Sequence, residues 1–267
     1  MFDVDGVLVD TAASYNEAVV RTVRWLIPGA PVDHAMVRLW KRRGDWNNDW
    51  DLAYGLYCWL LGPDGQPSAA AARRPLAALV AAAGPRVERS YTVVQGIFEE
   101  HYNGTARAVA RYGVRALVGN EDPLADRETI VLEPGHVAEL QAAGVRRFGV
   151  VTGRVRADWE QVVARLPLPP DTVVATDEDG RKPDPAGLAL VLDRLAASRF
   201  VLIGDTLNDL RMVQAYAEAG RVPGQAVILC EPEDEHGYRA AGATTFVRSL
   251  GDLVVTVRSL GTTAPRY

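Results

Sequence analysis

The second half of the chain alternates short apolar runs with helical stretches, and this alternation constrains the fold more than any other feature. Strands joined through helices lie parallel, because a right-handed crossover returns the chain to the same edge of the sheet. The runs are apolar at consecutive positions, which indicates that both faces of the sheet are covered. The pattern predicts strands at 147–151, 173–175, 200–203, 226–229 and 245–247, with helices at 159–166, 185–195 and 207–219.

A strand of the same character lies at the N-terminus, separated from the others by a long helical segment. Ser14 and Glu17 have the spacing of a capping box, and Asp33 is placed to cap a second helix. The fold class is therefore α/β, a doubly wound parallel sheet with an inserted helical domain. We predict a core domain of residues 1–13 and 126–267 and a helical cap domain of residues 14–125.

Two carboxylates lie two positions apart where the first strand meets a glycine turn, in Phe2-Asp3-Val4-Asp5-Gly6. Strand alternation places both on one face, where one can attack an electrophile and the other can transfer a proton. By itself the pattern fits a solvated strand end equally well. Strands usually have about five or six residues. Either this strand is unusually short, or residues upstream of Met1 belong to it.

Three further segments fall at predicted strand ends, where doubly wound sheets bind their ligands. Thr152 and Gly153 offer a hydroxyl and an amide to a phosphate oxygen, and a proline after Lys182 fixes the loop that carries this lysine. Asp205 and Asp209 lie one helical turn apart after another strand, and such carboxylates suit a hard cation such as Mg²⁺. Taken singly, the three segments fit a turn, a solvated lysine and a helix cap.

In series, Asp-x-Asp-Gly-Val, Thr-Gly, Lys-Pro and Gly-Asp-x-x-x-Asp resemble the motifs of the haloacid dehalogenase superfamily. The resemblance covers the whole core and implies a Rossmann-like fold. The helical insertion after the first strand is similar to the C1-type cap of subfamily I. The run Gly-Val-Leu-Val-Asp-Thr resembles the phosphoglycolate phosphatase-like branch.

The resemblance implies a role for each carboxylate. Asp3 would be the nucleophile that forms an aspartyl-phosphate, and Asp5 would act first as general acid and then as general base. Mg²⁺ would be held by Asp3, the backbone carbonyl of Asp5 and Asp205, with Asp209 positioning that coordination shell. The physics agrees, because carboxylates so close together ionise jointly only beside a cation.

The resemblance also implies the residues that hold the phosphate. Thr152 and the Gly153 amide would bind phosphate oxygens, and Lys182 would pair with the phosphate and with Asp3. A phosphate dianion approaches a carboxylate only if cations screen their repulsion. Arg154, directly after the Thr-Gly pair, is a further candidate substrate contact.

A polar and aromatic loop in the cap is the candidate for substrate selection. Its Asp45, Asn47 and Asn48 side chains are suited to hydrogen-bond a polyol or an amine. Trp46 or Trp50 would stack on the substrate, unless both tryptophans pack within the cap.

Composition favours an enzyme of a reducing compartment, and we expect it to be cytoplasmic. The formal net charge of −5 over 267 residues does not suggest a nucleic-acid surface or an anionic membrane as partner. Cys58 and Cys230 form no metal-binding pair. The sequence shows neither an apolar run long enough to span a membrane nor a signal-peptide pattern.

The favoured function is a Mg²⁺-dependent phosphatase acting on a small phosphorylated metabolite. A phosphomutase fits the same motifs, a phosphonatase would need Lys41 as its Schiff-base lysine, and a non-catalytic phosphometabolite-binding protein is the alternative from another class. Sugar phosphates, phosphoglycolate and amino-alcohol phosphates all suit these residues. The pattern leaves the oligomeric state open.

Overall fold

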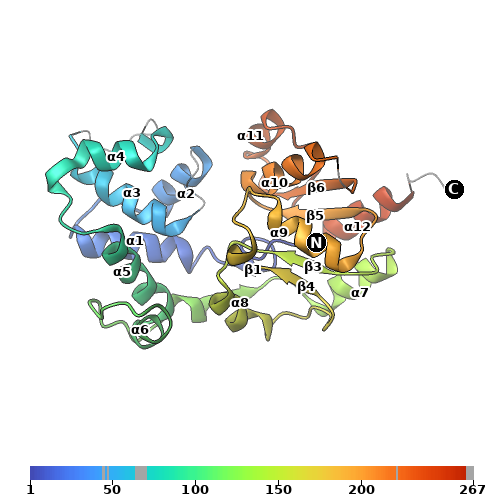
Figure 1. Ribbon diagram of the computed structural model, residues 1–267, viewed down its shortest axis with the longest axis horizontal. Helices are drawn as coiled ribbons and strands as arrows, with labels where there is room; N and C mark the ends of the chain where they lie inside the picture. Colours follow the sequence, from blue (N-terminus) through green and yellow to red (C-terminus); the bar gives the residue numbers. More distant parts are fainter. Residues whose placement is uncertain (44–45, 47, 64–70, 221, 263–267) are drawn as a thin grey trace. The chain divides into compact units, whose positions relative to one another are not determined.

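The computed structural model describes residues 1–43, 46, 48–63, 71–220 and 222–262 (Figure 1). The chain separates into two compact units. The core unit comprises Met1–Asp10 and Thr129–Tyr267, and the cap unit comprises Thr11–Glu128. Among the described residues, no helix is both long and apolar enough to cross a membrane.

A parallel sheet forms the centre of the core unit. The first residues of the chain lie between β3 and β5, since Phe2 N donates to Gly149 O and Asp3 N donates to Ile203 O, each at 2.9 Å. The sheet order is therefore β4, β3, residues 1–3, β5, β6 and β7. These strands are β3 (Gly149–Val151), β4 (Val173–Ala175), β5 (Phe200–Gly204), β6 (Gly224–Leu229) and β7 (Phe246–Val247).

Helices cover both faces of this sheet, as the continuous apolar strands predict. One layer contains α9 (Ala186–Leu195) and α10 (Leu207–Glu218), and the other contains α7 (Pro134–Ala142), α8 (Arg156–Val163) and α12 (Leu250–Thr262). Successive strand residues serve opposite layers: Leu202 packs with α9 and α10, and Ile203 packs with α7, α8 and α12. Burying one such side chain contributes about 1.5–3 kcal/mol to folding. Two smaller elements of this unit are η4 (Asp177–Asp179) and α11 (Glu235–Ala240).

A short antiparallel ribbon marks where the chain leaves and re-enters the core unit. It pairs β1 (Val9–Asp10) with β2 (Thr129–Ile130). All residues between these two strands belong to the cap unit. The α/β fold with a helical insertion is therefore confirmed.

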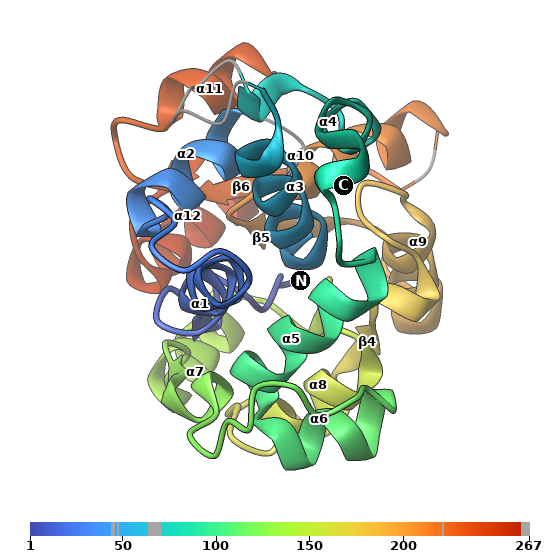
Figure 2. The same ribbon diagram turned by 90° about the vertical axis from the view of Figure 1, so that its left-hand side faces the viewer.

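Helices build the cap unit, and α1, α3 and α5 pack against one another (Figure 2). Its interior is rich in aromatic rings, including Trp40, Trp59, Phe98 and Tyr102. The helices are α1 (Tyr15–Leu26), α2 (His34–Arg43), α3 (Asp49–Leu61), α4 (Leu76–Ala83), α5 (Tyr91–Asn103) and α6 (Thr105–Tyr112), with 3₁₀ turns η1 (Ala71–Arg73), η2 (Gly84–Arg86) and η3 (Leu124–Arg127).

One of the two predicted helix caps is wrong. The Asp33 carboxylate accepts the Met36 N–H at 2.8 Å and caps the second helix as expected. The Ser14 side chain makes no capping bond: its backbone is helical (φ −109°, ψ −76°) rather than extended as in an N-cap, and its hydroxyl donates to Glu128 Oε1 at 3.0 Å. Glu17 accepts from Arg21 at 2.8 Å, so the expected capping box is absent from α1.

Candidate active site

The predicted motifs of the core unit converge at one edge of the parallel sheet. Asp3 ends the central strand, Thr152 directly follows β3, and Asp205 directly follows β5. Asp209 lies in the first turn of α10, and Lys182 lies in the loop before α9. Carboxyl ends of parallel strands share an edge, so residues far apart in sequence meet here.

Three of the carboxylates are close enough to share one cation. Asp3, Asp205 and Asp209 each offer an oxygen, and these oxygens lie within 4.8 Å of one another. Gly6 makes this approach possible: its φ is +73°, and a Cβ atom there would lie 2.0 Å from Asp205 Oδ2. Any other residue at position 6 would therefore displace Asp205 or the turn.

Lys182 pairs with two of these acids. Its Nζ lies 2.7 Å from Asp3 Oδ1 and 2.6 Å from Asp209 Oδ1, and its side chain is 9% exposed. Burial alone would lower the pKa of Lys182, but the Asp209 and Asp3 carboxylates outweigh it and hold this pKa above its ordinary value. Lys182 is thus a fixed cation between two acids.

The two oxygens of Asp3 differ in their environment. Oδ1 accepts from the Val4 N–H at 2.7 Å and from Lys182. Oδ2 accepts no hydrogen bond from any residue that the structure describes. Burial, followed by repulsion from Asp209, raises the pKa of Asp3 to about 7, against the attraction of Lys182. Two donors therefore hold one oxygen of the Asp3 carboxylate, and the other oxygen is available to react.

Asp209 is the most constrained acid of the group. Its Oδ2 accepts from the Thr206 hydroxyl at 2.6 Å and from the Thr206 N–H at 3.1 Å, and its Oδ1 accepts from Lys182. The Thr206 hydroxyl in turn caps the helix by accepting the Asp209 N–H at 3.3 Å. Both oxygens of Asp209 are thus engaged, which supports a role in positioning its neighbours.

Asp205 carries the polar atom that most clearly calls for a cation. Its Oδ1 is buried and has no hydrogen-bond partner among the described residues. Burial, and then repulsion from Asp3 and Asp209, raises the pKa of Asp205 well above its ordinary value. An unsatisfied buried carboxylate oxygen is costly, and a bound cation would satisfy it. The Tyr238 hydroxyl fixes the Asp205 backbone by donating to its carbonyl at 2.5 Å.

The charges of the site also fit one divalent cation. Four carboxylates meet two cationic side chains, so the fully ionised group carries two more negative than positive charges. Mg²⁺ prefers oxygen ligands, and one such ion would balance the two excess negative charges. The six residues are Asp3, Asp5, Asp205, Asp209, Lys182 and Arg154.

The residues that we predict to bind phosphate directly follow β3. Thr152 is buried, and its Oγ1 accepts the Arg154 N–H at 3.1 Å. Gly153 is exposed, and a Cβ there would have no atom within 4 Å, which leaves space for a phosphate. Arg154 pairs with Asp5 at 2.6 Å between Nη2 and Oδ1. Its predicted contact with substrate stays a prediction.

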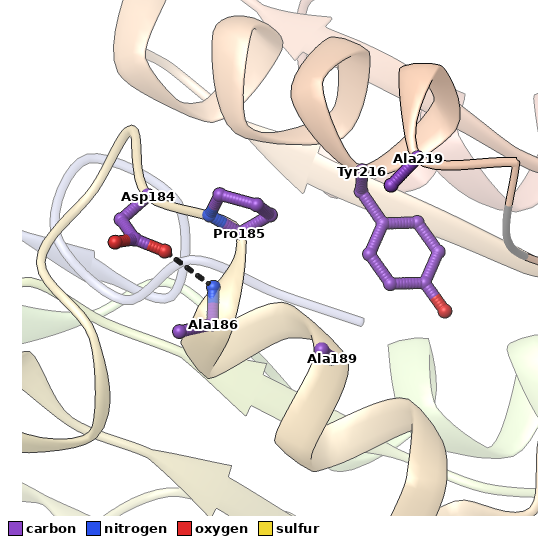
Figure 3. A pocket seen from close by; sticks show the side chains of 6 residues that line it. All are labelled: Asp184, Pro185, Ala186, Ala189, Tyr216 and Ala219. Atoms are coloured by element: carbon purple, nitrogen blue, oxygen red, sulfur yellow. Dashed lines mark hydrogen bonds between the residues drawn. The ribbon is translucent and has the colours of Figure 1, made fainter.

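The loop that carries Lys182 continues along a hollow of about 250 Å³ (Figure 3). The Asp184 carboxylate turns back and accepts the Ala186 N–H at 2.8 Å. Most of the lining is apolar, and we assign no ligand to this hollow. Its residues are Asp184, Pro185, Ala186, Ala189, Tyr216 and Ala219.

The cap loop shows a mixed outcome. Trp46 is 4% exposed, donates its indole N–H to Ala72 O at 2.6 Å, and packs against Trp40 with ring centroids 5.0 Å apart. This side chain therefore belongs to the interior of the cap, in agreement with the packing alternative. Asn48 caps α3 by accepting the Asp51 N–H at 2.9 Å. Asp45 and Asn47 lie outside the described residues.

The other cap residues that the sequence singled out have partners within the cap unit. The Trp50 indole N–H donates to Glu99 Oε1 at 2.7 Å, and Lys41 pairs with Asp49 at 2.8 Å. Sequence reasoning missed Tyr238 entirely. The tyrosine lies in a short helix without any motif, so nothing in its local sequence indicates that its hydroxyl supports Asp205.

Comparisons with known proteins identify the family of this chain. The family profile described as haloacid dehalogenase-like hydrolase matches residues 1–216. A curated relative from Phytophthora nicotianae, named imidazoleglycerol-phosphate dehydratase, is 27% identical over 214 residues. The match covers 79% of this chain but only 39% of that protein, so the chain spans well under half of its relative.

Solved structures share the fold. Phosphatase Tt82 from Thermococcus thioreducens has a TM-score of 0.66 at 21% identity, covering 91% of this chain and 98% of that one. A provisionally named phosphoglycolate phosphatase from Lactobacillus delbrueckii has a TM-score of 0.58 at 16% identity and 96% coverage of both chains. A provisionally named beta-phosphoglucomutase from Thermotoga maritima has a TM-score of 0.52 at 20% identity and 97% coverage of both. Because the family profile spans most of the chain, including all four motifs, this protein belongs to the haloacid dehalogenase-like hydrolases.

Proposed function

We propose that this protein is a Mg²⁺-dependent phosphatase that hydrolyses a small organic phosphomonoester through an aspartyl-phosphate on Asp3. The observation that carries the proposal is the asymmetry of the Asp3 carboxylate. Lys182 and the Val4 amide hold Oδ1, whereas Oδ2 has no hydrogen-bond partner among the described residues. A carboxylate held in this way presents one oxygen to an electrophile.

Asp3, Asp205 and the Asp5 backbone carbonyl would hold Mg²⁺, and Asp209 would position them. When bound, the ion would supply positive charge to the crowded carboxylates and to the phosphate oxygens. Burial, followed by repulsion from Asp209, raises the pKa of Asp3 and so disfavours its ionised form. Attack requires that ionised form, so a cation at this place would have a large effect.

The chain's own residues divide the reaction between them. Asp3 Oδ2 attacks phosphorus, the bond from phosphorus to the leaving oxygen breaks, and Asp5 gives that oxygen a proton. Asp5 then removes a proton from water, which attacks phosphorus and releases Asp3 and inorganic phosphate. Thr152, the Gly153 amide and Lys182 would hold the phosphate oxygens during both steps.

A phosphomutase is the second candidate. The same pair of aspartates would serve it, and a provisionally named beta-phosphoglucomutase shares the fold. The two activities differ in what receives the phosphoryl group from Asp3, which is water in a phosphatase and a second hydroxyl of the substrate in a mutase.

A panel of phosphorylated metabolites, with Mg²⁺ and with a chelator, tests the proposal. It includes sugar phosphates, phosphoglycolate, amino-alcohol phosphates and imidazoleglycerol phosphate, the last because the curated relative is named for it. We expect Mg²⁺-dependent release of inorganic phosphate that disappears in D3N. Isomerised sugar phosphate without free phosphate would favour the mutase, and binding without turnover would favour a non-catalytic protein.

A further inference from the structure

We propose that Arg154 is a positioning residue that fixes the Asp5 carboxylate for proton transfer to the leaving group. The inference rests on the proposed function, because Asp5 needs this orientation only if it exchanges a proton with a reacting oxygen. It assigns Arg154 a role other than the substrate contact that its sequence position suggests.

The contact between the two side chains is directional. Arg154 Nε lies 2.9 Å and Arg154 Nη2 lies 2.6 Å from the same atom, Asp5 Oδ1. Asp5 Oδ2 accepts no hydrogen bond from the part of the chain that the structure describes. Two donors on one oxygen fix the carboxylate plane and leave the second oxygen for the substrate.

The arginine is itself held in place. Its backbone N–H donates to Thr152 Oγ1 at 3.1 Å, and its backbone carbonyl accepts the Asp177 N–H at 3.0 Å. Its side chain is only 2% exposed, whereas the Asp5 side chain is 29% exposed. Arg154 is therefore a rigid support behind a partly exposed acid.

This placement distinguishes support from substrate binding. A guanidinium that binds a substrate anion directly must present donors to the open site, but this one is buried and directs two donors at Asp5. Its removal should affect the proton transfer that Asp5 performs more than the binding of phosphate.

Proton transfer matters most when the leaving group is a poor one. An aryl oxide such as 4-nitrophenoxide departs without an acid, whereas an alkoxide requires one. General acid catalysis is typically worth about 10²–10⁴-fold. A misplaced Asp5 should therefore slow alkyl phosphates far more than 4-nitrophenyl phosphate.

The experiment compares R154M and R154K with the wild type on a series of phosphomonoesters, from 4-nitrophenyl phosphate to simple alkyl phosphates, with Mg²⁺ present. For R154M we expect kcat/KM to fall about ten-fold or more further on alkyl than on aryl esters, with R154K between. R156M is the matched control: Arg156 lies two residues away, is half exposed and pairs with Asp179. The kcat/KM of R156M should match that of the wild type on every ester.

A double-mutant cycle with D5N completes the test. If Arg154 acts through Asp5, R154M in the D5N background should cause little further loss on alkyl esters. Equal losses across the ester series, a rise in KM with kcat unchanged, or full additivity with D5N would overturn the positioning role. If R154M does not fold, R154K provides the same comparison. Absence of turnover in the wild type would overturn the proposed function as well. Asp3-dependent turnover, combined with an R154M loss in kcat/KM that is the same for every ester, would overturn only this inference.

Discussion

Gly6 lies against Asp205 so closely that a Cβ atom at position 6 would stand 2.0 Å from Asp205 Oδ2. We therefore predict that G6A abolishes most activity by displacing Asp205 from its neighbours. The substitution also forces alanine into a positive φ, which costs about 1 kcal/mol by itself. The measurement is kcat together with the melting temperature of the core unit.

Gly144 supplies the control for G6A. Its φ is +96°, also positive, but a Cβ there would meet nothing within 4 Å. G144A should therefore show the backbone strain alone, with a small loss of stability and wild-type kcat. Equal activities for G6A and G144A would show that the contact with Asp205 has no catalytic importance.

Lys182 is the buried cation between Asp3 and Asp209. We predict that K182A lowers kcat by about 10² or more, the typical effect of removing one electrostatic stabiliser. K41A is the comparison, since Lys41 pairs with Asp49 in the cap unit. It should retain kcat, whereas loss of activity in K41A with retention in K182A would support the Schiff-base alternative instead.

Cation binding should also be visible without any substrate. Asp205 Oδ1 has no hydrogen-bond partner among the described residues, and its carboxylate is crowded by Asp3 and Asp209. Mg²⁺ should raise the melting temperature, because at a hundred-fold excess over Kd a ligand stabilises the native state by about 2.7 kcal/mol. Differential scanning calorimetry across a Mg²⁺ titration measures the shift.

D205N provides the matched test for the cation. The asparagine keeps the shape of the side chain but removes a charge and a strong oxygen donor. The melting temperature of this variant should respond much less to Mg²⁺. A response identical to that of the wild type would mean that the ion binds somewhere else.

His101 gives the cap unit a pH-dependent stability. Burial, and then repulsion from Arg21, lowers the pKa of His101 to about 4. In the unfolded chain this histidine has its ordinary pKa of about 6.5, so it binds a proton more readily than in the native state. Its contribution to the free energy of unfolding is therefore full above pH 6.5 and declines as the pH falls toward 4. By pH 5 the loss should be about 2 kcal/mol.

Hydrogen exchange of the α5 amides between pH 7.5 and pH 5, corrected for the intrinsic rates, measures this effect. H101N should flatten the pH dependence, whereas H236N should leave it unchanged because His236 is exposed on α11. Wild-type α5 amides with equal protection at both pH values would contradict the assignment.

Much of the core unit could be predicted from the sequence, because the pattern that defines each strand lies within that strand. Runs such as Phe200–Gly204 are apolar at successive positions, and β5 serves both helical layers. The motifs end such strands, so a parallel sheet brings Asp3, Thr152 and Asp205 to one edge. Residues 1–3 lie between β3 and β5, and backbone hydrogen bonds to both neighbours hold them there.

What the sequence did not reveal depends on distant partners. Ser14 matched a local capping pattern, but Glu128, 114 positions away, takes its hydroxyl. Arg154 and Asp5 are 149 positions apart, and no spacing rule connects them. Trp46 is the type of side chain that can stack on a ligand, yet its indole N–H donates to Ala72 O inside the cap. In each case the partner residue lies in another segment of the chain, and a local sequence pattern does not identify it.

In the proposed reaction the Asp3 carboxylate becomes covalently phosphorylated. Acid quenching during a single turnover, borohydride reduction and mass spectrometry of the N-terminal peptide test it directly. Reduction of an acyl phosphate at position 3 would leave homoserine there, and we expect this product in the wild type and not in D3N. Turnover with unmodified aspartate at position 3 at every quench time, or a phosphoryl group trapped on another residue, would show that Asp3 is not the nucleophile.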